Sequence, residues 1–198
     1  MALSREDLWS LEQYAEKRAE FRTKVLEHKK NRNVNLTPNA RLIFEDELTL
    51  RYQIQEMLRI EKVFEADGIQ DELDAYNPLI PDGDNWKCTF MLEFDDVPER
   101  RVKLAGLIGV ERQVWMQVEG HDKVFAIADE DLERENDEKT SSVHFMRFQL
   151  SPNMIIDAVG GAKVLAGCDH ENLLIEGLEL TDNVRDSLVN DLEKPTIN

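Results

Sequence analysis

The segment Asp46–Ala66, with the sequence DELTLRYQIQEMLRIEKVFEA, decides the fold that we expect. On a helical wheel its apolar side chains cover most of the circumference, and only a narrow sector is clearly polar. A helix of this kind is typical of the buried centre of a protein. We therefore expect a long central helix that needs cover on every side, and a homo-oligomer in which a second copy supplies part of that cover.

Three polar side chains fall inside the apolar arc of this helix, namely Gln53, Glu56 and Glu61. A buried carboxylate is costly unless it is paired, protonated or bound to a metal ion. Glu56, together with Glu61, is therefore a candidate for a functional polar site. The structural alternative is an ion pair with an arginine or a contact at a subunit interface, and it is the commoner of the two outcomes.

The sequence on either side of the long helix predicts an α+β fold. From Trp86 to Phe94 apolar and polar residues alternate, as in a half-buried strand. Further strands are expected at 34–36, 40–44, 113–118, 123–128, 142–150 and 173–180. Helices are expected at 4–30, 69–76 and 98–107, and after Ser151 and Thr181. We expect a mainly antiparallel sheet of about five strands, packed against the long helix and the N-terminal helical segment.

We treat residues 1–198 as a single domain with a helix-rich part, 1–84, and a sheet-rich part, 85–198. Turn residues refine the boundaries of the elements. Gly68 is placed to cap the C-terminal end of the long helix. A two-residue hairpin turn at Gly120–His121 would put Met116 opposite Phe125.

The predicted strand 142–150 carries a histidine and an arginine among apolar residues on both of its faces. Arg147 would need a carboxylate partner if it is buried, and Glu56 is the economical choice. His144 is a candidate metal ligand or acid–base group, because histidine side chains in general change charge near neutral pH. The alternative is a core histidine that is hydrogen-bonded to a carbonyl or hydroxyl. A metal site would use Glu56 and His144.

Composition limits the class of partner. The chain has 41 Asp and Glu against 24 Lys and Arg, which gives a net charge of −17. Nucleic acids and anionic membranes bind basic surfaces, so neither is expected as a partner. The N-terminus lacks the apolar segment of a secretory signal. Only Cys88 and Cys168 are present, which fits a reducing cytoplasm and leaves the role of both thiols open.

No specific motif indicates a cofactor. The chain contains no phosphate-binding loop, no zinc motif of the H-E-x-x-H type and no G-x-S-x-G nucleophile elbow. The acidic run Asp129–Lys139 does not match a calcium-binding EF-hand, because Arg134 stands where glycine is needed and Thr140 where glutamate is needed. We expect this run to be a solvated loop or helix face.

Two long segments resemble an uncharacterised bacterial family that is known as a domain of unknown function. They are FEDELTLRYQIQEMLRIEKVFEADGIQDELDAYNPLIPDG, from Phe44 to Gly83, and AIADEDLERENDEKTSSVHFMRF, from Ala126 to Phe148. The resemblance extends from about Leu3 to Leu192. It implies a cytoplasmic bacterial protein whose relatives are often encoded beside rubrerythrin-like and iron–sulfur oxidoreductase-like proteins. The family supplies no catalytic residues that could be transferred to this chain.

Three functions follow as hypotheses. The first is a cytoplasmic accessory protein that binds a protein partner in an oxidoreductase or metal-handling pathway. The second is a metal-binding protein or enzyme with a site built from Glu56, His144 and Arg147. The third is a small-molecule sensor with a pocket between the long helix and the sheet.

Overall fold

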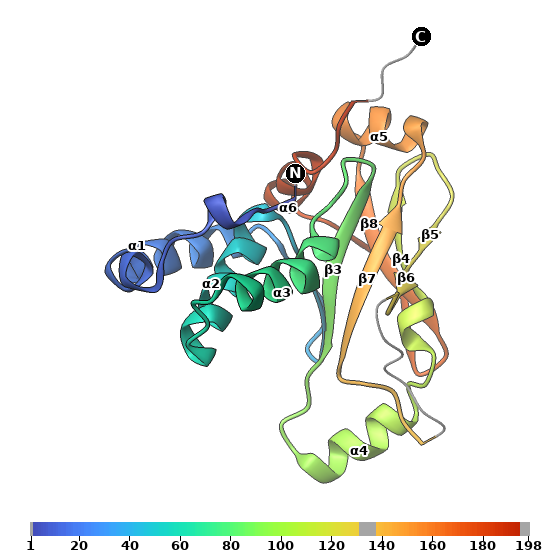
Figure 1. The fold of residues 1–198 in the computed structure, drawn as a ribbon. Helices are drawn as coiled ribbons and strands as arrows, with labels where there is room; N and C mark the ends of the chain where they lie inside the picture. Colours follow the sequence, from blue (N-terminus) through green and yellow to red (C-terminus); the bar gives the residue numbers. More distant parts are fainter. Residues whose placement is uncertain (1, 131–137, 195–198) are drawn as a thin grey trace.

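The computed structural model of this chain describes residues 2–130 and 138–194 (Figure 1). The helices are α1 (Leu11–Lys29), α2 (Glu47–Glu61), α3 (Ala66–Tyr76), α4 (Val97–Ala105), α5 (Pro152–Val159) and α6 (Asp182–Val189), with the 3₁₀ turns η1 (Arg5–Asp7), η2 (Asn77–Leu79) and η3 (Val110–Arg112). The strands are β1 (Asn33–Thr37), β2 (Ala40–Phe44), β3 (Asn85–Leu92), β4 (Val114–Val118), β5 (Val124–Phe125), β6 (Ile127–Ala128), β7 (Val143–Gln149), β8 (Val164–His170) and β9 (Leu173–Glu179). Most of the acidic run Asp129–Lys139 lies outside the described residues.

Two antiparallel sheets enclose the main hydrophobic core. One sheet has the strand order β1-β2-β3-β7-β6 and the other β5-β4-β8-β9. Buried side chains from both sheets, such as Trp86 and Val114, belong to one cluster, to which α4, α5 and α6 also contribute. The predicted α+β class and the antiparallel sheet of five strands are confirmed. The second sheet was not expected from the sequence.

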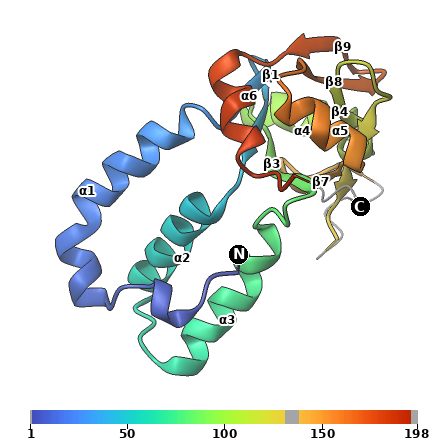
Figure 2. The ribbon, with the colours of Figure 1, turned by 90° about the horizontal axis from the view of Figure 1, so that it is seen from above.

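The first three helices pack together in what we call the helical arm, which consists of η1, α1, α2 and α3 (residues 5–29 and 47–76). Figure 2 shows these helices projecting away from the sheets. The arm has its own apolar clusters, one around Tyr14 and Phe21 and the other around Ile54 and Leu73. The long helix α2 is thus the middle helix of the arm and not the centre of the whole molecule. No helix in the described part of the chain combines a membrane-spanning length with a mostly apolar sequence.

Capping explains where α2 begins, and a left-handed residue explains where it ends. At its start the backbone N–H of Thr49 donates to Asp46 Oδ1 at 2.9 Å, and the Thr49 hydroxyl accepts from the N–H of Asp46. At its end Lys62 has φ 56°, which the helical conformation does not allow. The predicted extension to Ala66 and the predicted cap at Gly68 are therefore wrong, because Gly68 lies inside α3.

Within the single chain α2 is not covered on every side, and the cover that a second copy would supply stays a prediction. Ile60 in its last turn is 60% exposed, and Phe64 just beyond it is 72% exposed. The wheel identified apolar positions correctly but assumed that every apolar face finds a neighbour. The last turn of α2 and the segment that follows it lack such cover, and their apolar side chains therefore face solvent.

The register of the β4–β5 hairpin differs from the prediction by one residue. Trp115 pairs with Phe125 and Met116 with Val124, so Met116 does not face Phe125. The chain then leaves this sheet, since Ile127 pairs with Arg147 of β7 in the other one. The sequence pattern assumed one continuous strand from 123 to 128, whereas the structure divides it between two sheets.

A glycine in β8 makes room for the indole of Trp115, which is only 1% exposed. A Cβ atom at Gly167 would lie 2.1 Å from the Trp115 ring and 2.6 Å from the carbonyl oxygen of Ile175. We expect Gly167→Ala to lower the free energy of unfolding by about 1–3 kcal/mol, because overpacking forces the ring or backbone to move. Urea denaturation measures this loss. Gly106→Ala is the control, since its nearest neighbour would be 3.6 Å away, and an equal loss in both variants would contradict the explanation.

Candidate functional site

Glu56 is held in a closed ion pair between α1 and α2. The Arg18 guanidinium donates to Oε1 at 2.7 Å and to Oε2 at 2.9 Å, and the Tyr14 hydroxyl donates to Oε1 at 2.7 Å. Arg59 approaches Oε2 at 3.3 Å. Hydrogen bonds from Arg18, reinforced by Tyr14, lower the pKa of Glu56 to about 2, against the opposing effect of burial. Both carboxylate oxygens are thus occupied, which is the structural alternative that the sequence left open.

The other polar residues of the α2 arc occupy different environments. Gln53 is half-buried and Glu61 is exposed, so Glu61 does not join Glu56 in an enclosed site. Two polar residues of α2, Thr49 and Gln55, are fully buried. Thr49 belongs to the cap at the start of the helix, and Gln55 faces the segment before α1. The Gln55 side chain accepts from the backbone N–H of Trp9 at 2.7 Å and donates to the Trp9 carbonyl at 3.3 Å. Gln55 thereby anchors the segment that leads into α1.

His144 is a fully buried histidine whose ring nitrogens both have partners. Nδ1 lies 2.6 Å from the Asp129 carboxylate, and Nε2 lies 2.9 Å from the Thr140 hydroxyl. Asp129 also accepts from the backbone N–H of Phe145 at 3.1 Å. The ring therefore fixes the chain on either side of the segment 131–137. This arrangement fits the core-histidine alternative.

Arg147 does not pair with Glu56, so the predicted contact between them is wrong. Its guanidinium binds Glu130 at 2.8 and 2.9 Å and Gln149 at 2.7 Å. Arg147 lies on the face of β7 that is turned away from the core, whereas Glu56 faces α1. Glu56, His144 and Arg147 therefore belong to three separate networks and do not converge. In residues 2–130 and 138–194, no group of three His, Cys, Asp or Glu side chains is arranged to hold a metal ion.

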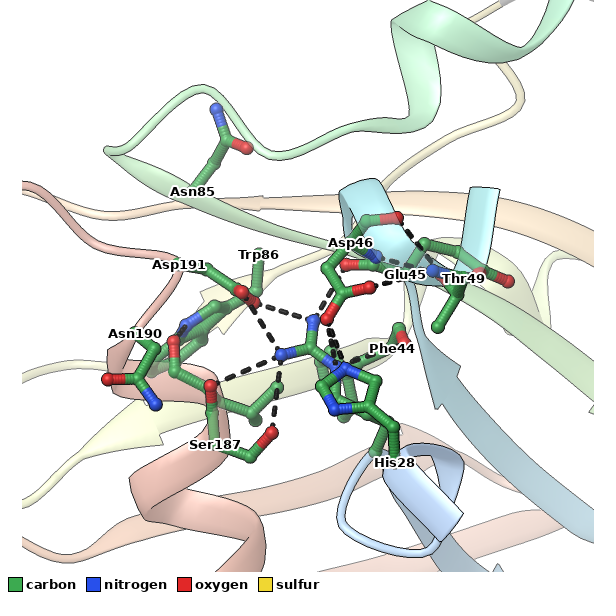
Figure 3. A network of polar contacts seen from close by, with 12 residues as sticks. His28, Phe44, Glu45, Asp46, Thr49, Asn85, Trp86, Ser187, Asn190 and Asp191 are labelled. Atoms are coloured by element: carbon green, nitrogen blue, oxygen red, sulfur yellow. Dashed lines mark hydrogen bonds and ion pairs between the residues drawn. The ribbon is translucent and has the colours of Figure 1, made fainter. Parts of the chain in front are cut away.

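The largest buried ionic cluster surrounds Arg32, which is 1% exposed and which the sequence indicated only as a helix end. Its guanidinium binds both oxygens of Asp191, at 3.0 and 2.7 Å, and lies 3.7 Å from Asp46 Oδ2. Asp46 in turn binds His28 Nε2. Figure 3 shows His28, Asp46 and Asp191 pointing toward one another from three different segments. The cluster fastens the helical arm to the C-terminal helix α6.

The pKa values of the two carboxylates in this cluster are shifted in opposite directions. Burial raises the pKa of Asp191 to about 6, because it outweighs the hydrogen bonds and charge of Arg32. Burial also opposes ionisation of Asp46, but Arg32, the Thr49 N–H and His28 together hold the pKa of that carboxyl below its usual value. Asp191 therefore takes up a proton at a higher pH than Asp46 does.

A polar cavity of about 830 Å³ opens beside this cluster. Five acids and two bases line it, namely Asp46, Glu47, Asp82, Asp191 and Glu193 with Lys24 and Arg51. Its surplus of acids matches the composition of the whole chain. Because Arg32 already binds Asp191 and lies close to Asp46, we interpret the ionic cluster as a structural contact that joins α1, α2 and α6.

An apolar groove of about 770 Å³ lies at the far end of the helical arm, between η1, the start of α1 and the α2–α3 connection. We call it the arm-tip groove. Its apolar lining consists of Leu8, Trp9, Leu11, Leu58, Val63, Phe64 and Ile69, and its polar rim of Arg5, Glu6, Ser10 and Glu12. The side chain of Phe64 is 72% exposed at its edge. The arm-tip groove thus combines a mostly apolar lining with a large exposed aromatic side chain.

Comparison with known proteins places the whole chain in one family. Residues 2–192 match the model of a family described as protein of unknown function, DUF3501. The chain is also similar to a crystal structure of a novel protein of unknown function from Burkholderia pseudomallei K96243. The two share 48% sequence identity with a TM-score of 0.93, over 98% of this chain and 100% of that one. No curated protein matches the chain.

Proposed function

This chain belongs to the DUF3501 family, whose function is unknown. We therefore propose a function from the surface of the chain itself. We propose that it is a non-enzymatic accessory protein that docks onto a partner protein through the arm-tip groove. The exposed Phe64 beside an apolar groove carries the proposal. Exposed apolar patches with a polar rim are typical of protein-binding surfaces. Burial of one such aromatic side chain contributes about 1.5–3 kcal/mol.

Hydrogen bonds hold the N-terminal segment beside the groove in place, which favours binding of a partner. Gln55 ties down the backbone of Trp9 through two hydrogen bonds. Asn77 likewise binds both the N–H and the carbonyl of Leu3, at 2.8 and 2.9 Å. Segments that are held in place before binding lose less conformational entropy when a partner arrives.

For the partner we propose an oxidoreductase in the bacterial cytoplasm. This class comes from the family resemblance, which implies gene neighbours of the rubrerythrin and iron–sulfur types. The chain's own thiols are poor candidates for the redox chemistry. Cys88 and Cys168 are both buried, and burial raises the pKa of each thiol, which makes a thiol unreactive. The redox step would therefore belong to the partner.

Phe64→Ser should reduce binding to the partner at least about tenfold, the effect of losing about 1.4 kcal/mol. The tagged protein would be cross-linked in a bacterium that encodes it, the captured proteins identified by mass spectrometry, and the affinity of the purified partner measured by calorimetry. Val102→Ser is the matched control, because Val102 on α4 is also 72% exposed but lies outside the arm. Val102→Ser should bind like the wild type.

Three results would contradict parts of this proposal. Equal capture by the Phe64 and Val102 variants would rule out the arm-tip groove as the docking surface. If the proteins lost with Phe64→Ser include no oxidoreductase, the redox assignment is wrong. If the only protein lost is the chain itself, the groove serves the homo-oligomer that the sequence predicted, and sedimentation equilibrium would show the dimer dissociating in the variant.

A further inference from the structure

A second cavity, of about 690 Å³, lies between α3 and the outer face of the five-stranded sheet. We call it the sheet-face pocket. Its lining is mostly apolar and includes Tyr76, Pro78, Leu79, Ile127 and Phe145. The volume is within the range of about 300–1,000 Å³ that is typical of small-molecule sites. It differs from the arm-tip groove in position and in its charged groups.

Two cations stand side by side at this pocket. Lys87 of β3 and Arg147 of β7 are directly paired residues in the antiparallel ladder, and both line the cavity. Like charges in that position destabilise a sheet unless anions offset them. Two adjacent cations stand out in a chain whose 41 acidic residues outnumber its 24 basic residues.

Two carboxylates offset these cations: Glu130, which lines the pocket, and Asp82, which lies outside its lining. Asp82 binds Lys87 Nζ at 2.7 Å, and Glu130 binds Arg147 at 2.8 and 2.9 Å. The two carboxylate side chains are 63% and 53% exposed, whereas the cations are 11% and 23% exposed. The fixed, more enclosed charges are thus positive, and the solvated ones are negative. Burial raises the pKa of Asp82, but its hydrogen bond to Lys87 and the nearby charges hold that pKa below its usual value. The hydrogen bond from Arg147 likewise lowers the pKa of Glu130.

We propose that the sheet-face pocket binds a small-molecule carboxylate with an apolar or aromatic body, whose carboxylate takes the place of Glu130 on Arg147. The body would lie on Phe145 and Tyr76. Arginine is suited to this role because its planar guanidinium binds a carboxylate through two parallel hydrogen bonds. Lys87 adds charge only, since its ammonium already donates to the carbonyls of Pro78 and Ile80 at 2.9 and 2.8 Å. This site is independent of the proposed docking surface.

Phenylbutyrate, with its neutral amide phenylbutyramide for comparison, tests the proposal by isothermal titration calorimetry on the full chain. We expect phenylbutyrate to bind about tenfold more tightly than the amide, which corresponds to about 1.4 kcal/mol. Arg147→Gln should remove this preference, and Arg147→Lys should retain part of it. Glu130→Gln should tighten phenylbutyrate several-fold and leave the amide unchanged, because it removes the competing carboxylate.

Arg41→Gln is the matched control. Arg41 lies on the same face of the sheet, pairs with Glu93 at 2.7 Å and is 29% exposed, but does not line the pocket. It should bind phenylbutyrate as the wild type does, and thermal unfolding would verify that each variant is folded. Equal affinity for acid and amide, weaker binding in Glu130→Gln, or the same loss in the Arg41 and Arg147 variants would each overturn the proposal. So would an absence of binding in both the wild type and Glu130→Gln.

Discussion

Replacement of Arg32 by alanine should lower the free energy of unfolding by about 3–5 kcal/mol, the range found when one partner of a buried ion pair is removed. The guanidinium is 1% exposed and binds Asp191 through both oxygens. It also donates to the backbone carbonyls of Phe44 and Glu45, at 3.3 and 2.7 Å. Its loss leaves two mostly enclosed carboxylates, with side chains 16% and 8% exposed, and several carbonyls without this donor.

Urea denaturation of the wild type and of Arg32→Ala at neutral pH measures this loss. Arg185→Ala is the control, because its partners Asp182 and Asp186 are 87% and 69% exposed, and surface pairs contribute only about 0–1 kcal/mol. Acid should reduce the deficit of Arg32→Ala, since Asp191 and Asp46 can then take up protons in place of the lost cation. A deficit no larger than that of Arg185→Ala would show that Arg32 does not fasten the arm to α6.

The sequence predicted most elements of this fold because their signals are local. Capping residues and periodicity mark α2, α4, α5 and α6. Strict alternation marks β3, and residues that are apolar on both faces mark β7. Strand β8 was missed because Ala166 and Gly167 at its centre give a weak strand signal. Gly167 has no side chain because the Trp115 ring packs on it, a contact between strands that are far apart in the sequence. Its absence from the prediction also hid the second sheet.

The partners of the buried charges could not be predicted, because each pair joins distant segments. The sequence showed correctly that Glu56 needs a partner, but Arg18 stands 38 residues before it and Arg147 was an equally acceptable choice. Arg32 and Asp191 are 159 residues apart, and nothing local marks either of them as buried. The need for a counter-charge follows from the helical wheel, whereas the choice of partner follows from how the arm folds back on the sheets.

The exposure of Phe64 shows the same limit for apolar residues. A wheel reports that a side chain is apolar, and it cannot report whether another element reaches it. Here α2 ends at Glu61, and Phe64 lies in the connection to α3 with its side chain 72% exposed. The surface on which the proposed function rests is thus found where the single chain leaves apolar side chains uncovered.

Glu56→Gln should lower the free energy of unfolding by about 2–3 kcal/mol at neutral pH, and this cost should depend on pH. The pKa of Glu56 is lowered from 4.5 to about 2 in the folded protein, chiefly by Arg18. A carboxyl with a lowered pKa stabilises the fold above its unfolded-state pKa, and this contribution is lost as the pH falls toward the folded-state value. The gap between wild type and variant should therefore be full above pH 4.5 and should narrow steadily below it.

Urea denaturation at a series of pH values tests this, with Glu72→Gln as a control of opposite sign. Burial and the nearby Glu61 and Asp71 raise the pKa of Glu72, so its ionised form opposes folding and its replacement should be neutral or stabilising at neutral pH. If the deficit of Glu56→Gln stayed constant across the pH range, the negative charge of Glu56 would not be the source of its contribution. A deficit that closes with acid identifies the Arg18–Glu56 ion pair as the charge interaction that joins α1 to α2, and hence as a condition for the arm that presents the groove.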